Sequence, residues 1–109
     1  MERARITHPP SNMTVQLGGT VSLTCTVGRS FRSQTRIDWF KDGMPLVYNT
    51  SEALKSVSNE TLEQIRHSLS EDGTLHVHNV QATDAGQYTC IASNQAGFTS
   101  AMAYLNIAG

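Results

Sequence analysis

The sequence predicts an all-β fold, a Greek-key sandwich of two antiparallel sheets, and two observations carry that prediction. Short segments of alternating apolar and polar residues follow one another between turn signals such as Asp42-Gly43 and Asp72-Gly73, which is the pattern of half-buried strands. The second observation is the set Cys25, Trp39, Tyr88 and Cys90. In a sandwich, two cysteines can bridge the sheets and a tryptophan on a neighbouring strand can lie against the sulfurs. A tyrosine two residues before the second cysteine can tie its strand to the backbone.

The N-terminal half of the chain contains the first three expected strands. Pro9-Pro10 cannot continue a ladder and suits the start of an edge strand, which runs through residues 14–17 to a turn at Gly18-Gly19. Residues 21–25 alternate with Val, Leu and Cys on one face, and residues 37–40 alternate with Ile and Trp inward. The Asp-Gly pair that follows is a strong signal for a tight turn and ends the third strand.

The C-terminal half contains a long connection and then four more strands. Residues 46–65 are expected to form the connection, with a short edge strand and a helical turn within it. A strand at 65–69 is separated from one at 74–80 by the second Asp-Gly pair. The last two strands are expected at 87–93 and about 98–107, joined by a turn at 94–97.

Length and charge indicate one domain without a global electrostatic field. The 109 residues suit a single sandwich, with the domain at 9–107, an N-terminal flank or linker at 1–8 and a C-terminal flank at 108–109. A net charge of −1 argues against nucleic acid as a partner. No apolar run is long enough for direct membrane insertion, and no signal peptide is found. We therefore expect the chain to be a piece of a larger protein.

Three N-glycosylation sequons indicate an extracellular compartment. They begin at Asn12, Asn49 and Asn59, and attachment of a glycan requires passage through the secretory pathway. A disulfide would also persist only in an oxidising compartment. The sequence therefore predicts a secreted protein or a cell-surface ectodomain.

With these residues placed, the chain resembles the I-set immunoglobulin family over residues 9–107. The resemblance is carried by the segments VSLTC (21–25), WFKDG (39–43), DGTL (72–75), NV (79–80), DAGQYTC (84–90) and ASNQAG (92–97). The run 72–97 is similar to I-set modules of secreted matrix proteins (ADAMTS-like/punctin, papilin, hemicentin and peroxidasin types). It is also similar to modules of leucine-rich-repeat cell-surface proteins. The resemblance implies an immunoglobulin-like sandwich with one inter-sheet disulfide, Cys25–Cys90, and adhesion or ligand binding without catalysis.

The resemblance also implies a structural ion pair. The family pairs the aspartate of the DAGQYTC segment, here Asp84, with an arginine that opens the strand across the base of the sandwich. Arg66 is the best positional match in this sequence. Together with Trp39 and Tyr88, the pair is expected to be architectural and to contact no ligand.

Strand alternation predicts a candidate binding surface. If Trp39 and Cys90 face the core, then four large side chains point outward from three strands that pair as one sheet in this family: Phe40, Ile91, Met102 and Tyr104. Such a patch is unusual on a lone soluble domain and suits a protein ligand or homo-association. The alternative is that a glycan, the stems of Arg36 or Lys41, or a neighbouring domain covers it.

A basic segment lies between the second and third strands. Arg29, Arg32 and Arg36 punctuate a loop that also contains Phe31. Guanidinium groups at one end of a sandwich suit an acidic protein surface or a sulfated glycan. The alternative, which we favour for this segment, is a solvated loop whose charges aid solubility.

Neither metal nor catalytic chemistry is predicted. His76 and His78 share one face of a strand, and His67 lies one strand away. A structural zinc site usually has four ligands, and because no convincing fourth is found, exposed histidines are the favoured interpretation. The sequence contains no phosphate loop and no nucleophile with an evident base, so we expect no cofactor and no enzyme.

These observations predict an extracellular protein–protein recognition or adhesion module of a secreted matrix or cell-surface protein. Two alternatives stay open. One is an intracellular structural module of a cytoskeletal or muscle protein, in which both cysteines would be reduced. The other is a passive spacer that sets the distance between its neighbours.

Overall fold

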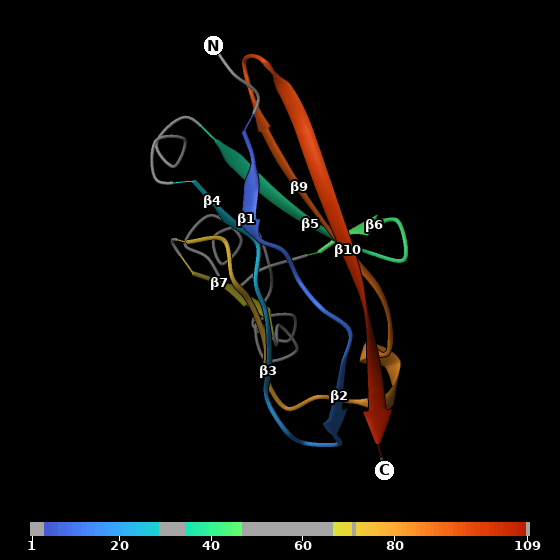
Figure 1. Ribbon diagram of the computed structural model, residues 1–109. Coiled ribbons are helices and arrows are strands. Elements are labelled where there is room, and N and C mark those ends of the chain that lie inside the picture. The colour runs from blue at the N-terminus through green and yellow to red at the C-terminus, as the bar shows by residue number, and fades with distance from the viewer. Residues whose placement is uncertain (1–3, 29–34, 47–66, 71, 109) are drawn as a thin grey trace, which may run out of the picture.

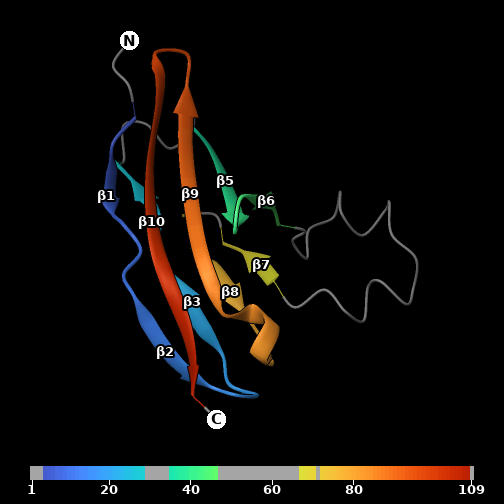
Figure 2. The ribbon, with the colours of Figure 1, turned by 90° about the vertical axis from the view of Figure 1, so that its right-hand side faces the viewer.

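A computed structural model describes residues 4–28, 35–46, 67–70 and 72–108 as an all-β sandwich (Figure 1). Its larger sheet has five strands in the spatial order β2-β10-β9-β5-β6. β9 and β10 form its centre and are the longest strands, which Figure 2 shows side by side. The strands are β2 (Met13–Gln16), β5 (Arg36–Lys41), β6 (Met44–Pro45), β9 (Gly86–Asn94) and β10 (Gly97–Ala108).

The second layer is made of shorter strands. A three-stranded sheet has the order β3-β8-β7, and a separate two-stranded ladder joins β1 to β4. A 3₁₀ turn, η2 (Ala82–Asp84), leads into β9. The strands are β1 (Ile6–His8), β3 (Val21–Leu23), β4 (Thr26–Val27), β7 (His67–Leu69) and β8 (Leu75–Val77).

The two layers close on the core that the sequence predicts. Cys25 and Cys90 form a disulfide between the layers with their Cα atoms 6.5 Å apart. Trp39 is 1% exposed, and its indole Nε1 donates a hydrogen bond to the carbonyl of Gly73 at 3.0 Å. Gly73 has a φ of +93°, and a Cβ there would collide with the carbonyl oxygen of Cys25, so the Asp-Gly turn also lets two chain segments approach closely.

The predicted tyrosine corner is present at the base of the sandwich. The Tyr88 hydroxyl donates to the carbonyl oxygen of Asp84 at 2.7 Å, which ties the start of β9 to η2. The Asp84 carboxylate is buried and accepts the amide of Gln81 at 2.7 Å. Its expected partner, Arg66, lies outside the described residues, as does nearly all of the connection expected at 46–65.

The N-terminal strand differs from expectation. β1 pairs with β4, and Ala4 is 1% exposed, so the sandwich begins before the boundary expected at Pro9. Pro9-Pro10 lies between β1 and β2, where the chain crosses from one layer to the other and needs no ladder hydrogen bonds. β2 then pairs with β10 in parallel, so the larger sheet is mixed rather than purely antiparallel.

Candidate interaction surface

One side of the five-stranded sheet carries the four side chains that alternation predicts to point outward. Phe40 on β5 and Met102 on β10 both pair with Thr89 of β9, from opposite sides. Residues directly paired in an antiparallel ladder project to the same face. Ile91 and Tyr104 lie two residues further along their strands and share that face, because side chains alternate with a period of two.

Exposure divides these four side chains into two groups. Met102 is 50% and Tyr104 49% exposed, whereas Phe40 and Ile91 are half-buried. The Met102 sulfur accepts a hydrogen bond from the side-chain amide of Gln87 at 3.3 Å. The most exposed apolar atoms of the four therefore lie along β10.

Phe98 belongs to the same surface and was not predicted. It is 61% exposed and pairs with Ser93, opposite Arg36 at the start of β5. The signal was present in the sequence, since Phe98 has the same alternation as Met102 and Tyr104 on β10. We call this surface the outer face and define it by Phe40, Ile91, Phe98, Met102 and Tyr104.

The charged groups on the outer face compensate each other. Arg36 Nε lies 3.0 Å from Asp38 Oδ2, with 80% and 33% of the two side chains exposed. Arg36 is the first residue of β5 and lies at the edge of the outer face. The expectation that it belongs to a basic loop was wrong. Arg29 and Arg32 lie outside the described residues, so a cationic cluster of the three stays a prediction.

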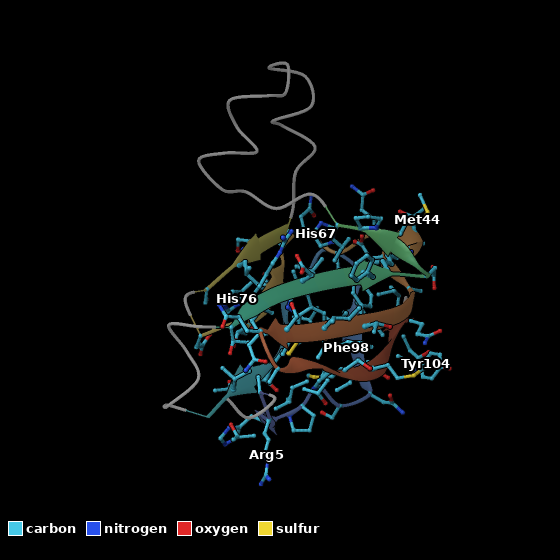
Figure 3. All side chains as sticks on the ribbon, turned by 90° about the horizontal axis from the view of Figure 1, so that it is seen from above. Arg5, Met44, His67, His76, Phe98 and Tyr104 are labelled. Carbon is cyan, nitrogen blue, oxygen red and sulfur yellow. A yellow bond between two sulfur atoms is a disulfide. The ribbon has the colours of Figure 1, made fainter. Side chains whose placement is uncertain are left out.

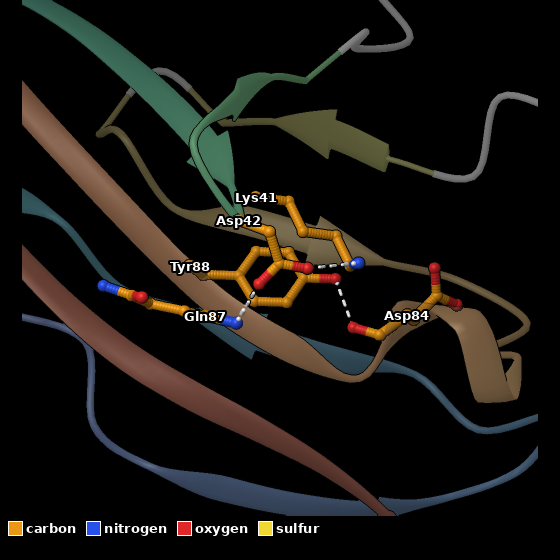
Figure 4. Close-up of polar contacts among 5 residues, drawn as sticks. All are labelled: Lys41, Asp42, Asp84, Gln87 and Tyr88. Atoms are coloured by element: carbon orange, nitrogen blue, oxygen red, sulfur yellow. Dashed lines mark hydrogen bonds and ion pairs between the residues drawn. The ribbon is translucent and has the colours of Figure 1, made fainter.

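The β5–β6 turn is fixed by a carboxylate at the end of the outer face (Figure 4). Asp42 has a φ of +51°, and its Oδ1 accepts the Gln87 amide at 2.9 Å while Oδ2 lies 3.1 Å from Lys41 Nζ. These contacts, led by the Gln87 hydrogen bond, lower the pKa of Asp42 below its ordinary value of 3.8. A Cβ on Gly86 would approach the two Asp42 carboxylate oxygens to 2.7 and 2.8 Å, so this position favours glycine.

One of the three sequons lies beside the outer face. Asn12 is exposed, and its Oδ1 accepts the backbone amide of Tyr104 at 2.9 Å. The side-chain nitrogen, the atom that would carry a glycan, is not used in that hydrogen bond. Asn49 and Asn59 lie outside the described residues.

The opposite sheet has a different outer surface, made of histidines and serines. His76 on β8 and His78, which directly follows that strand, have their ring centroids 6.3 Å apart, and Figure 3 shows His76 on the opposite side of the sandwich from Tyr104. His67 pairs with Val77 and so projects toward the core side, away from His76. In the described part of the chain no three His, Cys, Asp or Glu side chains could hold a metal ion. Likewise, no helix in that part is long and apolar enough to cross a membrane.

Comparison with known proteins identifies relatives for almost the whole chain. A family model described as an immunoglobulin domain matches residues 4–94. Leucine-rich repeat-containing protein 4B of mouse is 34% identical over 102 residues, which cover 94% of this chain and 12% of that protein. Vascular endothelial growth factor receptor 3 of zebrafish is 34% identical over 110 residues, covering 100% and 7%. The chain therefore spans a small fraction of the curated relatives it matches.

Solved structures with the same fold include modules of two kinds of protein. The I-band fragment I67–I69 of titin superposes with a TM-score of 0.72 and is 30% identical, covering 98% of this chain and 33% of that one. Extracellular domains 3–5 of Drosophila OTK superpose with a TM-score of 0.74 and are 26% identical, covering 98% and 32%.

Proposed function

The chain belongs to the immunoglobulin domain family, and on that premise we propose that it is an extracellular protein–protein recognition module that binds a protein ligand through the outer face. The observation that carries the proposal is the row of exposed apolar side chains on β10, with Phe98, Met102 and Tyr104 each about half exposed or more. Contiguous apolar surface of this kind on a soluble domain marks an interaction site. Binding without catalysis is part of the proposal.

The arrangement suits equilibrium binding on a preformed surface. The sheet beneath the outer face is held by the Cys25–Cys90 disulfide and a close-packed core, so little backbone order has to be gained on association. Large apolar side chains at the centre supply buried area, while the Arg36–Asp38 pair supplies a polar rim. We expect Met102 and Tyr104 to dominate the affinity because a partner would bury most of their surface.

Two observations support the extracellular compartment. The solved OTK relative is an extracellular fragment, and Cys25 and Cys90 are placed to form a disulfide, which persists in oxidising compartments. The likeness to leucine-rich repeat-containing protein 4B favours a parent with leucine-rich repeats over a matrix protein. A matrix parent remains the alternative.

The likeness to the titin I-band fragment supports the rival function, an intracellular structural module or spacer. The two are separated by expressing the chain with a secretory leader in eukaryotic cells and analysing the product by mass spectrometry. The extracellular proposal predicts an intact disulfide and a glycan at Asn12. A secreted product with two free thiols and no glycan would favour the intracellular module.

Binding through the outer face is tested with a pair of matched double variants. The chain, made multivalent, is screened against an array of purified extracellular proteins, and the affinity for each hit is measured by surface plasmon resonance. Ile91→Asp with Tyr104→Ala should weaken binding by at least about tenfold, because it places a charge in the apolar centre and removes an anchor. Ser22→Asp with His78→Ala makes the same kinds of change on the opposite sheet and should leave affinity unchanged. Equal affinities of the two variants would exclude the outer face.

Two further partner predictions are open to direct test. Sedimentation of the isolated chain measures homo-association through the outer face, which the Ile91→Asp variant should abolish. Binding of heparin tests the sulfated-glycan prediction for Arg29, Arg32 and Arg36. Heparin affinity that does not fall as salt is raised would contradict an electrostatic site.

A further inference from the structure

The outer edge of β10 is covered along only part of its length. β2 pairs with residues 105–108 of β10 and ends the ladder there. The next amide on that edge, that of Tyr104, is accepted by the Asn12 side chain at 2.9 Å. From Gly97 to Ala103, β10 pairs with β9 on one side, and no described strand pairs with its other side.

The backbone groups on this open edge can be assigned from the strand's alternation. The Tyr104 amide and the Ala108 carbonyl both point toward the β2 side, where they bond Asn12 and the Leu17 amide. Within a strand, alternate residues direct their N–H and C=O groups to the same side. Phe98, Ser100 and Met102 therefore present theirs to the open edge, and no hydrogen bond from the described chain reaches the amides of Ser100 and Met102.

A groove runs along this edge. It has a volume of about 580 Å³ and is open to solvent. One wall is formed by Thr99, Ser100 and Ala101 of β10, and the other by the segment around β1, with Ala4, Arg5, Ile6 and Pro9. An extended chain laid along the wall of unpaired backbone would pair with β10 at the spacing of neighbouring strands in a sheet, about 4.8 Å.

The charge of the side chains that line the groove indicates what kind of extended segment would bind there. Arg5 lines it and extends into solvent at the edge of the molecule (Figure 3). Among the described residues, the other two cationic side chains, Arg36 and Lys41, each have a carboxylate partner, whereas Arg5 has no ion pair. A guanidinium without an ion pair beside a backbone edge favours an acidic side chain on the bound segment.

We propose that the open edge of β10 accepts an extended acidic segment of a partner protein as an added strand, paired with Ser100 and Met102 and ion-paired with Arg5. A second copy of the chain suits the groove less well. A two-fold pairing of β10 edges would bring both Arg5 side chains into one groove, and an entire sandwich edge would have to enter beside β1. This site uses the backbone edge of β10, whereas the outer face uses side chains, although both include Met102, and it goes beyond the function proposed above.

The test uses two blocked hexapeptides, Thr-Val-Glu-Val-Thr-Val and its counterpart with Lys in place of Glu, titrated into the ¹⁵N-labelled chain. The Glu peptide should shift the amides of Phe98, Ser100 and Met102, slow their hydrogen exchange, and bind several-fold tighter than the Lys peptide. Arg5→Glu should reverse that order. Absence of binding, or shifts confined to the Phe40 and Ile91 region, would overturn the proposal.

A proline at position 100 gives a second test with a matched control. Ser100→Pro removes the edge-facing N–H without touching the ladder to β9, a position where strands tolerate proline, and should abolish peptide binding. Ser100→Ala keeps the N–H and should bind normally. If the proline variant does not fold, the Arg5→Glu reversal still decides the matter. If the Ser100 and Met102 amides of the free chain are already as protected from exchange as that of Ala101, the edge is covered by the chain itself and the proposal fails.

Discussion

The outer surfaces of the two sheets differ in the kind of side chain that each presents to solvent. On the β3-β8-β7 sheet, the His76 ring nitrogens lie 2.8 Å from Ser22 Oγ and 2.7 Å from Ser70 Oγ, and His78 Nε2 lies 3.1 Å from Ser68 Oγ. These polar side chains satisfy one another across three chain segments. The outer face of the other sheet instead presents Phe98, Met102 and Tyr104 to water.

This difference indicates which of the two surfaces would gain more free energy from contact with a partner. Hydroxyl and imidazole groups that already bond each other gain little from a new neighbour. Exposed apolar side chains gain by every contact that removes water from them. Both sheets direct alternate side chains into the core. On the outer surface of the β3-β8-β7 sheet the polar side chains already bond one another, whereas the apolar side chains of the outer face would be stabilised by association with a partner.

The largest expected effect comes from breaking what the two surfaces share. Replacing Cys25 and Cys90 together by alanine releases a link across 65 residues and should lower the free energy of unfolding by about 4 kcal/mol, because the unfolded chain regains loop freedom. Urea unfolding of the oxidised wild type and the double variant measures this. An effect below about 1 kcal/mol would show that the sandwich does not depend on the link.

The next effect compares one chemical change on the inner and outer sides of a single sheet. Tyr88→Phe removes the hydroxyl that bonds the Asp84 carbonyl in the buried corner and should cost about 2 kcal/mol, since the carbonyl is left without that donor. Tyr104→Phe makes the identical change at a half-exposed site and should change stability by less than about 0.5 kcal/mol. Similar losses for both variants in urea unfolding would contradict the assignment of sides.

A smaller effect distinguishes the two outer surfaces directly. His76→Ala removes both hydrogen bonds to the serines and should cost about 1 kcal/mol. Met102→Ala on the outer face should be close to neutral in the isolated chain, yet it should weaken binding to a partner found by the screen. If Met102→Ala lowered the thermal unfolding temperature more than His76→Ala does, the outer face would contribute to the stability of the fold rather than serve as a binding surface.

The smallest effect is the pH dependence of the turn at the end of the outer face. Because the folded chain lowers the pKa of Asp42, its charged form stabilises the fold above the unfolded value of about 3.8, and that contribution is lost as the pH falls through the lower folded pKa. Asp42→Asn keeps an acceptor oxygen and tolerates positive φ, but removes the charge. The stability difference between wild type and variant should shrink at acidic pH. A constant difference from neutral to acidic pH would exclude the charge as its cause.

Sequence reasoning located the core and the outer face because both follow from alternation around a few anchors. Trp39 and Tyr88 fixed the inward direction of β5 and β9, and from that Phe40, Ile91, Met102 and Tyr104 followed. The same alternation reaches Phe98, which was not predicted although it lies on the same face of β10 as Met102 and Tyr104. The binding role of these residues stays a proposal.

What could not be predicted depends on contacts between segments far apart in the sequence. The pairing of β1 with β4, the parallel attachment of β2 and the open β10 edge beside Arg5 all result from where the chain crosses between layers at Pro9-Pro10. Proline predicts an interruption of a ladder. It does not say which strand is found on either side.

The sequence by itself predicted an immunoglobulin-like sandwich and which side chains leave its core, because period-two alternation and the cysteine, tryptophan and tyrosine positions are local or fixed by spacing. Only the tertiary structure decided on which outer surface the polar side chains bond one another, and along which residues β10 lacks a neighbouring described strand. Those properties arise from pairings such as Ser22 with His76 and Asn12 with Tyr104, which join residues that no local pattern connects.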